Sequence, residues 1–170
     1  AAGYGHPSTV LVLLQHSANI DLQDTHGSTA LMSAADYGQE PCVQALLRAK
    51  ANPDLQSNIG GTALMSTACR GHEACAKALL RAKANPDLQN TFGNTALMCA
   101  TKHVSEACVK ALLRAKANPD LQDISGDTAL MMAAQEAHEA CVKTLLRAKA
   151  NTELLDKDGH TALQHAEIKG

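Results

Sequence analysis

The apolar positions of this chain follow a helical spacing in short runs separated by polar turns. Residues 30–35 read Ala-Leu-Met-Ser-Ala-Ala, and Thr29 before them offers a hydroxyl to the unpaired N–H groups of a first helical turn. Gly38 ends this run, and residues 40–49 form a second one. The apolar stripe of the second run consists of Val43, Leu46 and Leu47. The pattern predicts two short helices followed by a turn.

This unit recurs with a constant period of 33 residues. The stretch LLRAKANPDLQ starts at Leu46, Leu79 and Leu112, and a fourth copy at Leu145 changes after LLRAKAN. Gly is followed two residues later by Thr-Ala-Leu in five successive units, and no insertion interrupts the period. Because one such unit cannot bury its apolar face alone, neighbouring units must stack. The period therefore predicts an elongated solenoid.

The repeated motif D-x-x-G-x-T-A-L-M-x-A-A-x-x-G, followed by V-x-A-L-L, resembles the ankyrin repeat. The chain departs from the usual family pattern by having Ala where Pro is preferred and Met where His is preferred, and by Val104 and Ala137 in place of the Gly between the helices. The resemblance implies an all-α ankyrin-repeat solenoid of stacked helix pairs with projecting hairpin tips. The whole chain is then one domain, with full repeats at 24–56, 57–89, 90–122 and 123–155 and partial repeats at 1–23 and 156–170.

Comparison of the units with one another separates constant columns, which serve the shared architecture, from variable ones. The variable columns fall at the turn tips and late in the first helix of each unit. In proteins that this chain resembles, these two regions line a concave surface that binds partner proteins. The candidate partner-binding residues are His26, Ile59, Phe92, Ile124 and Asp127 at the turns, and Tyr37, Arg70, Lys102, His103 and Gln135 late in the first helices.

Ile59, Phe92 and Ile124 are the most informative of these candidates, because they place apolar side chains at three successive exposed turns. Apolar anchors surrounded by polar groups are typical of binding hot spots. The alternative interpretation is that each tip side chain packs on its neighbouring turn.

The composition fits a soluble protein built from small helices. Apolar residues make up 45%, charged residues 19% and aromatic residues 2% of the 170 residues. The formal net charge of −2 argues against a nucleic-acid binder, which needs a basic surface. No apolar run approaches the roughly 18 residues of a membrane-spanning segment. The apolar stretch Val10–Leu14 is too short for one and lacks the flanking features of a signal peptide.

The cysteines and histidines do not form an evident chemical site. Four cysteines share one core column, and about 10 Å between stacked helices exceeds disulfide reach. They are interpreted as small buried hydrophobes of an intracellular protein, cytoplasmic or nuclear. Cys69-x-x-His72-x-x-Cys75 has a metal-like spacing without an apparent fourth ligand, so we expect no metal or cofactor. The sequence contains no catalytic triad, phosphate loop or paired-carboxylate pattern, which argues against an enzyme.

Both ends of the chain fall within a unit, since the first five residues align with residues 34–38. Two interpretations stay open. The chain is a fragment of a longer array, or its half repeats complement each other between molecules, because residues 156–170 and residues 6–23 of a second copy together have the length of one repeat. We predict a non-catalytic module that binds a partner protein, with a structural solenoid assembling head to tail as the alternative.

Overall fold

The computed structural model describes residues 1–168, in which ten short helices follow one another without a strand. Their bounds are α1 Pro7–Gln15, α2 Ala30–Asp36, α3 Glu40–Arg48, α4 Ala63–Arg70, α5 Glu73–Arg81, α6 Ala96–Lys102, α7 Glu106–Arg114, α8 Ala129–Gln135, α9 Glu139–Arg147 and α10 Ala162–Ile168. The longest of them have nine residues. None of the helices in this range is long and apolar enough to cross a bilayer, which takes about 20 residues.

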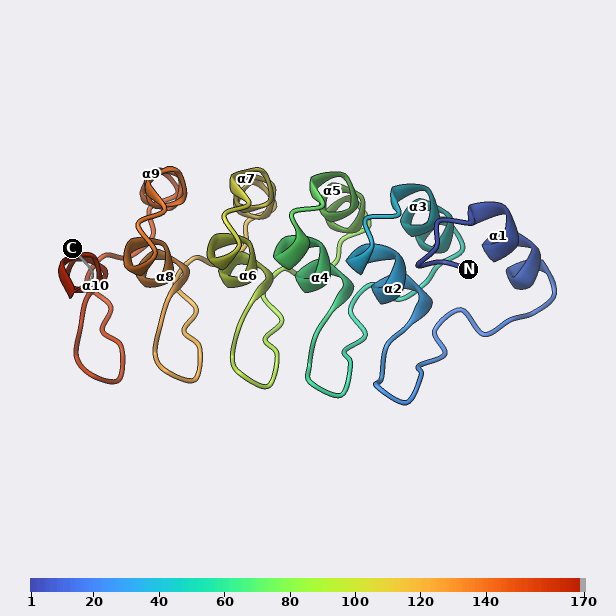
Figure 1. Cartoon of the computed structure of the whole chain (residues 1–170), viewed down its shortest axis with the longest axis horizontal. Coiled ribbons are helices and arrows are strands. Elements are labelled where there is room, and N and C mark those ends of the chain that lie inside the picture. The colour runs from blue at the N-terminus through green and yellow to red at the C-terminus, as the bar shows by residue number, and fades with distance from the viewer. Residues whose placement is uncertain (169–170) are drawn as a thin grey trace.

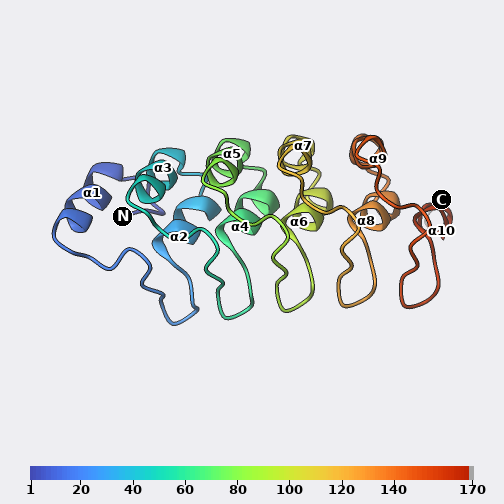
Figure 2. The same cartoon turned by 180° about the vertical axis from the view of Figure 1, so that it is seen from behind.

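The helices form two rows, and long turns project from one of them (Figure 1). The first row consists of α2, α4, α6, α8 and α10, and each of its members packs against the next. The second row consists of α1, α3, α5, α7 and α9, which stack in the same way. The turns leave the first row on the side away from the second row, as Figure 2 shows from behind. The predicted all-α solenoid of stacked helix pairs is confirmed.

The core is a continuous layer between the two rows. Each complete helix pair contributes one buried leucine from its first helix and one from its second: Leu31 and Leu46, Leu64 and Leu79, Leu97 and Leu112, and Leu130 and Leu145. The four periodic cysteines are buried beside them, as predicted: Cys42, Cys75, Cys108 and Cys141. Leu47, predicted for the same stripe, is half-buried because it lies in a groove between α3 and α5.

Each first helix begins at a threonine that caps it. The hydroxyl oxygen of Thr95 accepts a hydrogen bond from the backbone N–H of Met98 at 3.3 Å, and the other units repeat this contact. The Met98 sulfur in turn accepts the backbone N–H of Thr95 at 3.4 Å. The methionine that stands where the family prefers histidine therefore takes part in the cap, here and again at Met131.

The connection between the two helices requires a left-handed backbone. Gly38 has a φ of 66°, and a Cβ there would come within 2.7 Å of the His72 ring from the next unit. Val104 and Ala137 hold the same conformation at 58° and 55° without being glycine. The left-handed region costs a residue with a side chain about 1–2 kcal/mol, and a β-branched one fits it worst. These two units therefore carry local strain that the rest of the fold offsets.

The turns of successive units are joined by side chains of the NPDLQ stretch. The Asp54 carboxylate accepts the backbone N–H of Asn85 at 2.8 Å. The Gln56 amide donates to Gln89 O at 3.0 Å and to Gly60 O of its own turn at 2.9 Å. We call these contacts the Asp-Gln ladder. It recurs at every junction, with Asp21, Asp87 and Asp120 in the role of the aspartate and Gln23, Gln89 and Gln122 in that of the glutamine.

Two further contacts strengthen these junctions. The backbone N–H at one tip donates to a carbonyl oxygen at the preceding tip, as from Thr91 to Ile59 O and from Ile124 to Phe92 O, at 3.0 and 3.1 Å. His72 and His138 stand at the start of second helices but do not cap them. Their rings contact the first helix of the preceding unit instead. A ring N–H of His72 donates to Asp36 O, and one of His138 donates to Thr101 O.

Removing one carboxylate of the Asp-Gln ladder should destabilise the whole domain. We expect Asp87→Ala to lower the free energy of unfolding by about 1 kcal/mol, because the backbone N–H of Asn118 loses its acceptor. Urea unfolding followed by circular dichroism measures the change. Asp87→Asn is the matched control, since it keeps an amide oxygen in place and should cost less. Equal stability of the wild type and Asp87→Ala would contradict a structural role for the ladder.

Candidate functional site

Three successive turn tips present apolar side chains to solvent. Ile59, Phe92 and Ile124 are 61%, 54% and 55% exposed. The backbone at each tip is held by hydrogen bonds to the adjacent turn, so the apolar side chains stand on a fixed support. More than half of each residue remains accessible, which means that the neighbouring turn covers it only in part. The three tips therefore form a row of available apolar contacts.

A hollow of about 290 Å³ lies between the first two tips and the end of α2. Tyr37 and Ile59 line it together with Met32, Asp36 and serines of both units. Tyr37 is 67% exposed, and its ring lies next to Gly3, where an added Cβ would approach the ring to 3.2 Å. The structure thus brings Tyr37 and Ile59 to one site, although 22 residues separate them in the sequence. His26, at the first tip, is exposed.

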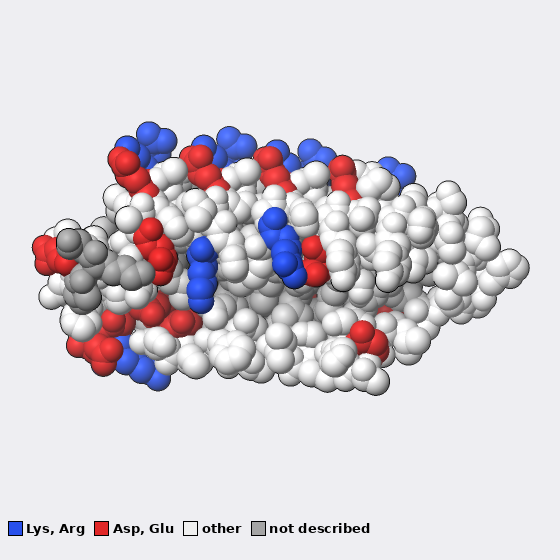
Figure 3. Space-filling model, in the orientation of Figure 1, with Lys and Arg blue, Asp and Glu red and all other residues white. Residues whose placement is uncertain are grey.

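The charged candidates lie at the ends of the first helices. Arg70 at the end of α4 pairs with Asp36 of the preceding unit, with 3.0 Å between Nε and Oδ1. The hydrogen bond to Asp36 and the charge of that carboxylate raise the pKa of Arg70. Lys102 and His103 are exposed at the end of α6, and Gln135 is half-buried at the end of α8. Figure 3, in the orientation of Figure 1, shows basic side chains in the middle of the molecule and acidic ones gathered at its C-terminal end.

Cys69 has a neighbour that the sequence did not reveal. It is paired by a hydrogen bond with Cys99, a half-buried thiol of the next unit. This hydrogen bond lowers the pKa of Cys69 to about 7, and the charges of Arg70 and Lys102 act in the same direction. The same contact and burial raise the pKa of Cys99. Cys69 is therefore the thiol with the highest thiolate fraction among those whose pKa is raised or lowered in the described chain.

The other members of the Cys69-x-x-His72-x-x-Cys75 motif face elsewhere. The His72 ring donates to Asp36 O at 3.1 Å, and Cys75 lies in the core at 1% exposure. Burial raises the pKa of Cys75 to about 11. The motif thus supplies one reactive thiol, one contact between units and one core residue.

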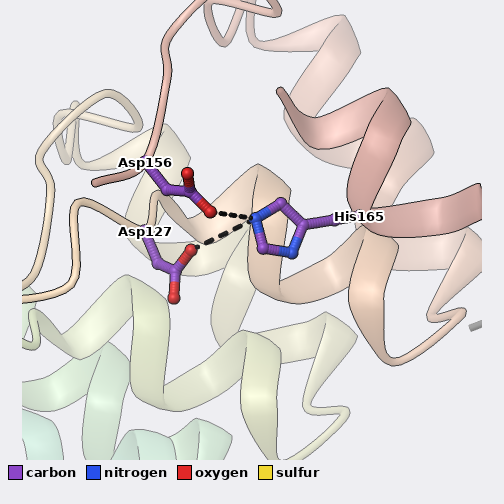
Figure 4. Close-up of side chains that lie close together, drawn as sticks. All are labelled: Asp127, Asp156 and His165. Atoms are coloured by element: carbon purple, nitrogen blue, oxygen red, sulfur yellow. Dashed lines mark hydrogen bonds and ion pairs between the residues drawn. The ribbon is translucent and has the colours of Figure 1, made fainter. Parts of the chain in front are cut away.

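Asp127 is half-buried at the base of its turn. Its Oδ1 lies 3.5 Å from Nε2 of His165 on α10 (Figure 4). The same nitrogen lies 2.8 Å from Oδ2 of Asp156. Burial, followed by the charge of nearby Asp123, raises the pKa of Asp127. The sequence predicted Asp127 on an open turn surface, whereas the structure places it in a cluster with residues of the next unit. Comparing equivalent positions of the repeats does not reveal such a contact, because its members occupy different positions in their units.

The Asp156 carboxylate is fixed by its own turn. Its Oδ1 accepts the backbone N–H groups of His160 and Asp158 at 2.8 and 2.9 Å. These bonds and the contact with His165 lower the pKa of Asp156, the bond from His160 having the largest effect. His160 Nδ1 lies 3.5 Å from Asp156 Oδ2. Two imidazoles and two carboxylates thus meet at the C-terminal end of the turn row.

Comparison with known proteins agrees with the architecture. A family model described as ankyrin repeats, in three copies, matches residues 1–57, 41–123 and 104–170, which together span the chain. A search of curated proteins finds no match.

The thiol pair gives a pH-dependent prediction. A thiolate alkylates and a thiol does not, so the iodoacetamide reaction of Cys69 should reach half its maximal rate near pH 7. Cys75, with a pKa of about 11, is the internal control and should stay unreactive over this range. Cys99→Ala removes the hydrogen bond and should move the Cys69 midpoint to higher pH. Peptide mass spectrometry resolves the sites, and a Cys69 midpoint unaffected by Cys99→Ala would contradict the pairing.

Proposed function

Because the chain belongs to the ankyrin repeat family, whose members generally act as protein–protein interaction modules, we propose that it binds a partner protein through its turn tips and the adjoining ends of its first helices. Ankyrin repeats are typically non-enzymatic, and the proposed function involves no catalysis. The six free cysteines favour a reducing, intracellular setting, in the cytoplasm or the nucleus.

The observation that carries this proposal is the row of exposed apolar tips at Ile59, Phe92 and Ile124. Hot spots of protein interfaces combine apolar or aromatic anchors with a polar surround that excludes water. The tip backbones are already ordered by hydrogen bonds between the turns, so binding would lose little further backbone entropy. A groove, extended segment or helix of the partner with apolar side chains would suit such a row.

The charged side chains near the tips suggest how a partner would be oriented along the row of turns. Arg70 is already paired with Asp36, whereas Lys102 and His103 lie exposed one unit further on. An acidic group on the partner would suit that middle position, and a basic group would suit the acidic C-terminal end (Figure 3). Tyr37 and the hollow beside Ile59 would take an apolar side chain at the N-terminal end.

The tips can be tested as a set. We expect the triple variant Ile59→Asp, Phe92→Asp and Ile124→Asp to weaken partner binding about 30-fold or more, because hot-spot residues contribute about 2 kcal/mol or more. Affinity capture with the wild type, identification by mass spectrometry and titration of the recovered partner provide the measurement.

The matched control for the tip variant is the triple change Arg81→Gln, Arg114→Gln and Arg147→Gln. It lowers the net charge by the same amount at exposed ends of the second helices. It should leave binding unchanged if the tips carry the affinity. Equal capture by the tip variant and the wild type would reject the proposed surface.

A second candidate function is head-to-tail assembly, and the exposed leucines of the two terminal helices favour it. Leu163 on α10 is 70% exposed, while its counterpart Leu130 in the preceding unit is 2% exposed. Leu13 on α1 is 51% exposed, while its counterpart Leu46 is 1% exposed. A groove of about 690 Å³ beside α10 is lined by apolar side chains of α8 and α9. A helix like α1 from a second copy would supply the partner that α10 lacks among the described residues.

Light scattering over a concentration series tests the assembly. The wild type should grow in mass with concentration, because a head-to-tail contact does not close on itself. Leu13→Asp and Leu163→Asp each block one end and should be monomeric alone. Their equimolar mixture should form dimers that do not grow. The intact C-terminal end of Leu13→Asp can bind the intact N-terminal end of Leu163→Asp, and the two remaining ends are blocked. A wild type that stays monomeric at all concentrations would exclude this candidate.

A further inference from the structure

The cluster at the C-terminal end of the turn row is more than a set of acids. One imidazole nitrogen and two carboxylate oxygens lie within 4.8 Å of one another in it (Figure 4). These atoms are His165 Nε2, Asp156 Oδ2 and Asp127 Oδ1. The three side chains are 12%, 7% and 21% exposed, so water covers little of them. We propose that these three residues bind a divalent transition-metal ion of the zinc class.

The spacing of the ligand atoms fits a small tetrahedral ion. Zinc bonds nitrogen and carboxylate oxygen at about 2.0–2.2 Å, which places tetrahedral ligands roughly 3.3–3.6 Å apart. His165 Nε2 lies 2.8 Å from one carboxylate oxygen and 3.5 Å from the other. The longer distance already lies in the required range and the shorter one is below it, so a small side-chain rotation that moves His165 and Asp156 apart would open the site for the ion.

One oxygen of the cluster lacks the partner that a cation would supply. Asp127 Oδ1 is inaccessible to solvent and accepts no hydrogen bond from the residues that the structure describes. An uncompensated buried carboxylate oxygen is unfavourable, and such atoms usually have a hydrogen-bond donor or a metal beside them. The ring nitrogen beside it, His165 Nε2 at 3.5 Å, already donates to Asp156 at the shorter distance of 2.8 Å. A metal ion would serve both carboxylates at once.

The groups behind the ligands hold them in place. Asp156 uses Oδ1 to accept two backbone N–H groups of its turn, which leaves Oδ2 directed at His165. The Asp127 backbone N–H donates to Asp123 Oδ1 at 3.0 Å, so its position at the base of the turn is fixed as well. Hydrogen bonds of this kind orient ligands and raise metal affinity.

The donor types select the class of metal. Imidazole and carboxylate together suit zinc and similar ions, whereas calcium and magnesium prefer oxygen ligands alone. The position of His165 holds Ser33, Ser66, Cys99 and Met132 in the other units, so the proposed site belongs to this end of the chain. Bound metal would tie the turn of one unit to α10 of the next.

Cobalt(II) substitution tests the site directly. Co²⁺ added to the protein should give the visible absorption of a tetrahedral complex, and Zn²⁺ should abolish it with one equivalent per chain. We expect His165→Ala and the isosteric Asp127→Asn each to weaken Zn²⁺ binding by more than the roughly 10–100-fold that loss of an outer partner causes. His103→Ala, which removes an exposed histidine elsewhere, is the control and should bind as the wild type does.

Two further readouts keep the result interpretable. Urea unfolding without metal shows whether each variant is folded, and Zn²⁺ should raise the midpoint of the wild type but not of His165→Ala. Absorption bands typical of cobalt–thiolate bonds would place the metal on cysteines and overturn the assignment. Unchanged Zn²⁺ affinity in both folded variants would overturn it too. The absence of any Co²⁺ spectrum would also overturn it and would leave His165 as a hydrogen-bond partner of Asp156 only.

Discussion

The fold depends on satisfying the backbone of long turns that have no strand or helix of their own. Backbone N–H and C=O groups need hydrogen-bond partners, and each unit leaves such groups outside any helix where its chain passes from the second helix to the next tip. The Asp-Gln ladder supplies the partners from the neighbouring unit, as Asp54 does for Asn85 and Gln56 for Gln89. Because both contacts span a fixed number of residues, an insertion between them would break the ladder, and a constant period follows.

The same constraint explains why some positions are free to vary. Backbone contacts and ladder side chains fix the tips, and Ile59 and Phe92 take part in these contacts through their backbone carbonyls, not through their side chains. Isoleucine, phenylalanine or histidine can occupy the tip without changing how the turns meet. Variation concentrates there and at the ends of the first helices, whose side chains point past the packed rows. A surface of this kind can acquire a partner without a cost in stability.

Much of this architecture could be predicted from the sequence because the signals are local or strictly periodic. The threonine caps, the helix pairs and the burial of the repeated cysteines follow from patterns within one unit. The pairs Cys69–Cys99 and Asp127–His165 escaped prediction because each joins different columns of adjacent units. Finding them requires the angle and offset between stacked helices, which the period alone does not supply. The contacts by which the polar residues of NPDLQ join neighbouring units also escaped prediction, for the same reason.

One column links the two unusual chemical features. Cys99 and His165 occupy equivalent positions in their first helices, where other units have Ser33, Ser66 and Met132. In the last unit this position faces Asp156, whose second oxygen remains available because a turn aspartate needs only one for its backbone contacts. The turn residue is constrained by the fold, but the residue opposite it is not. A single substitution there can therefore add a thiol or an imidazole to an existing array of acceptors, so new chemistry can arise without any change in how the units stack.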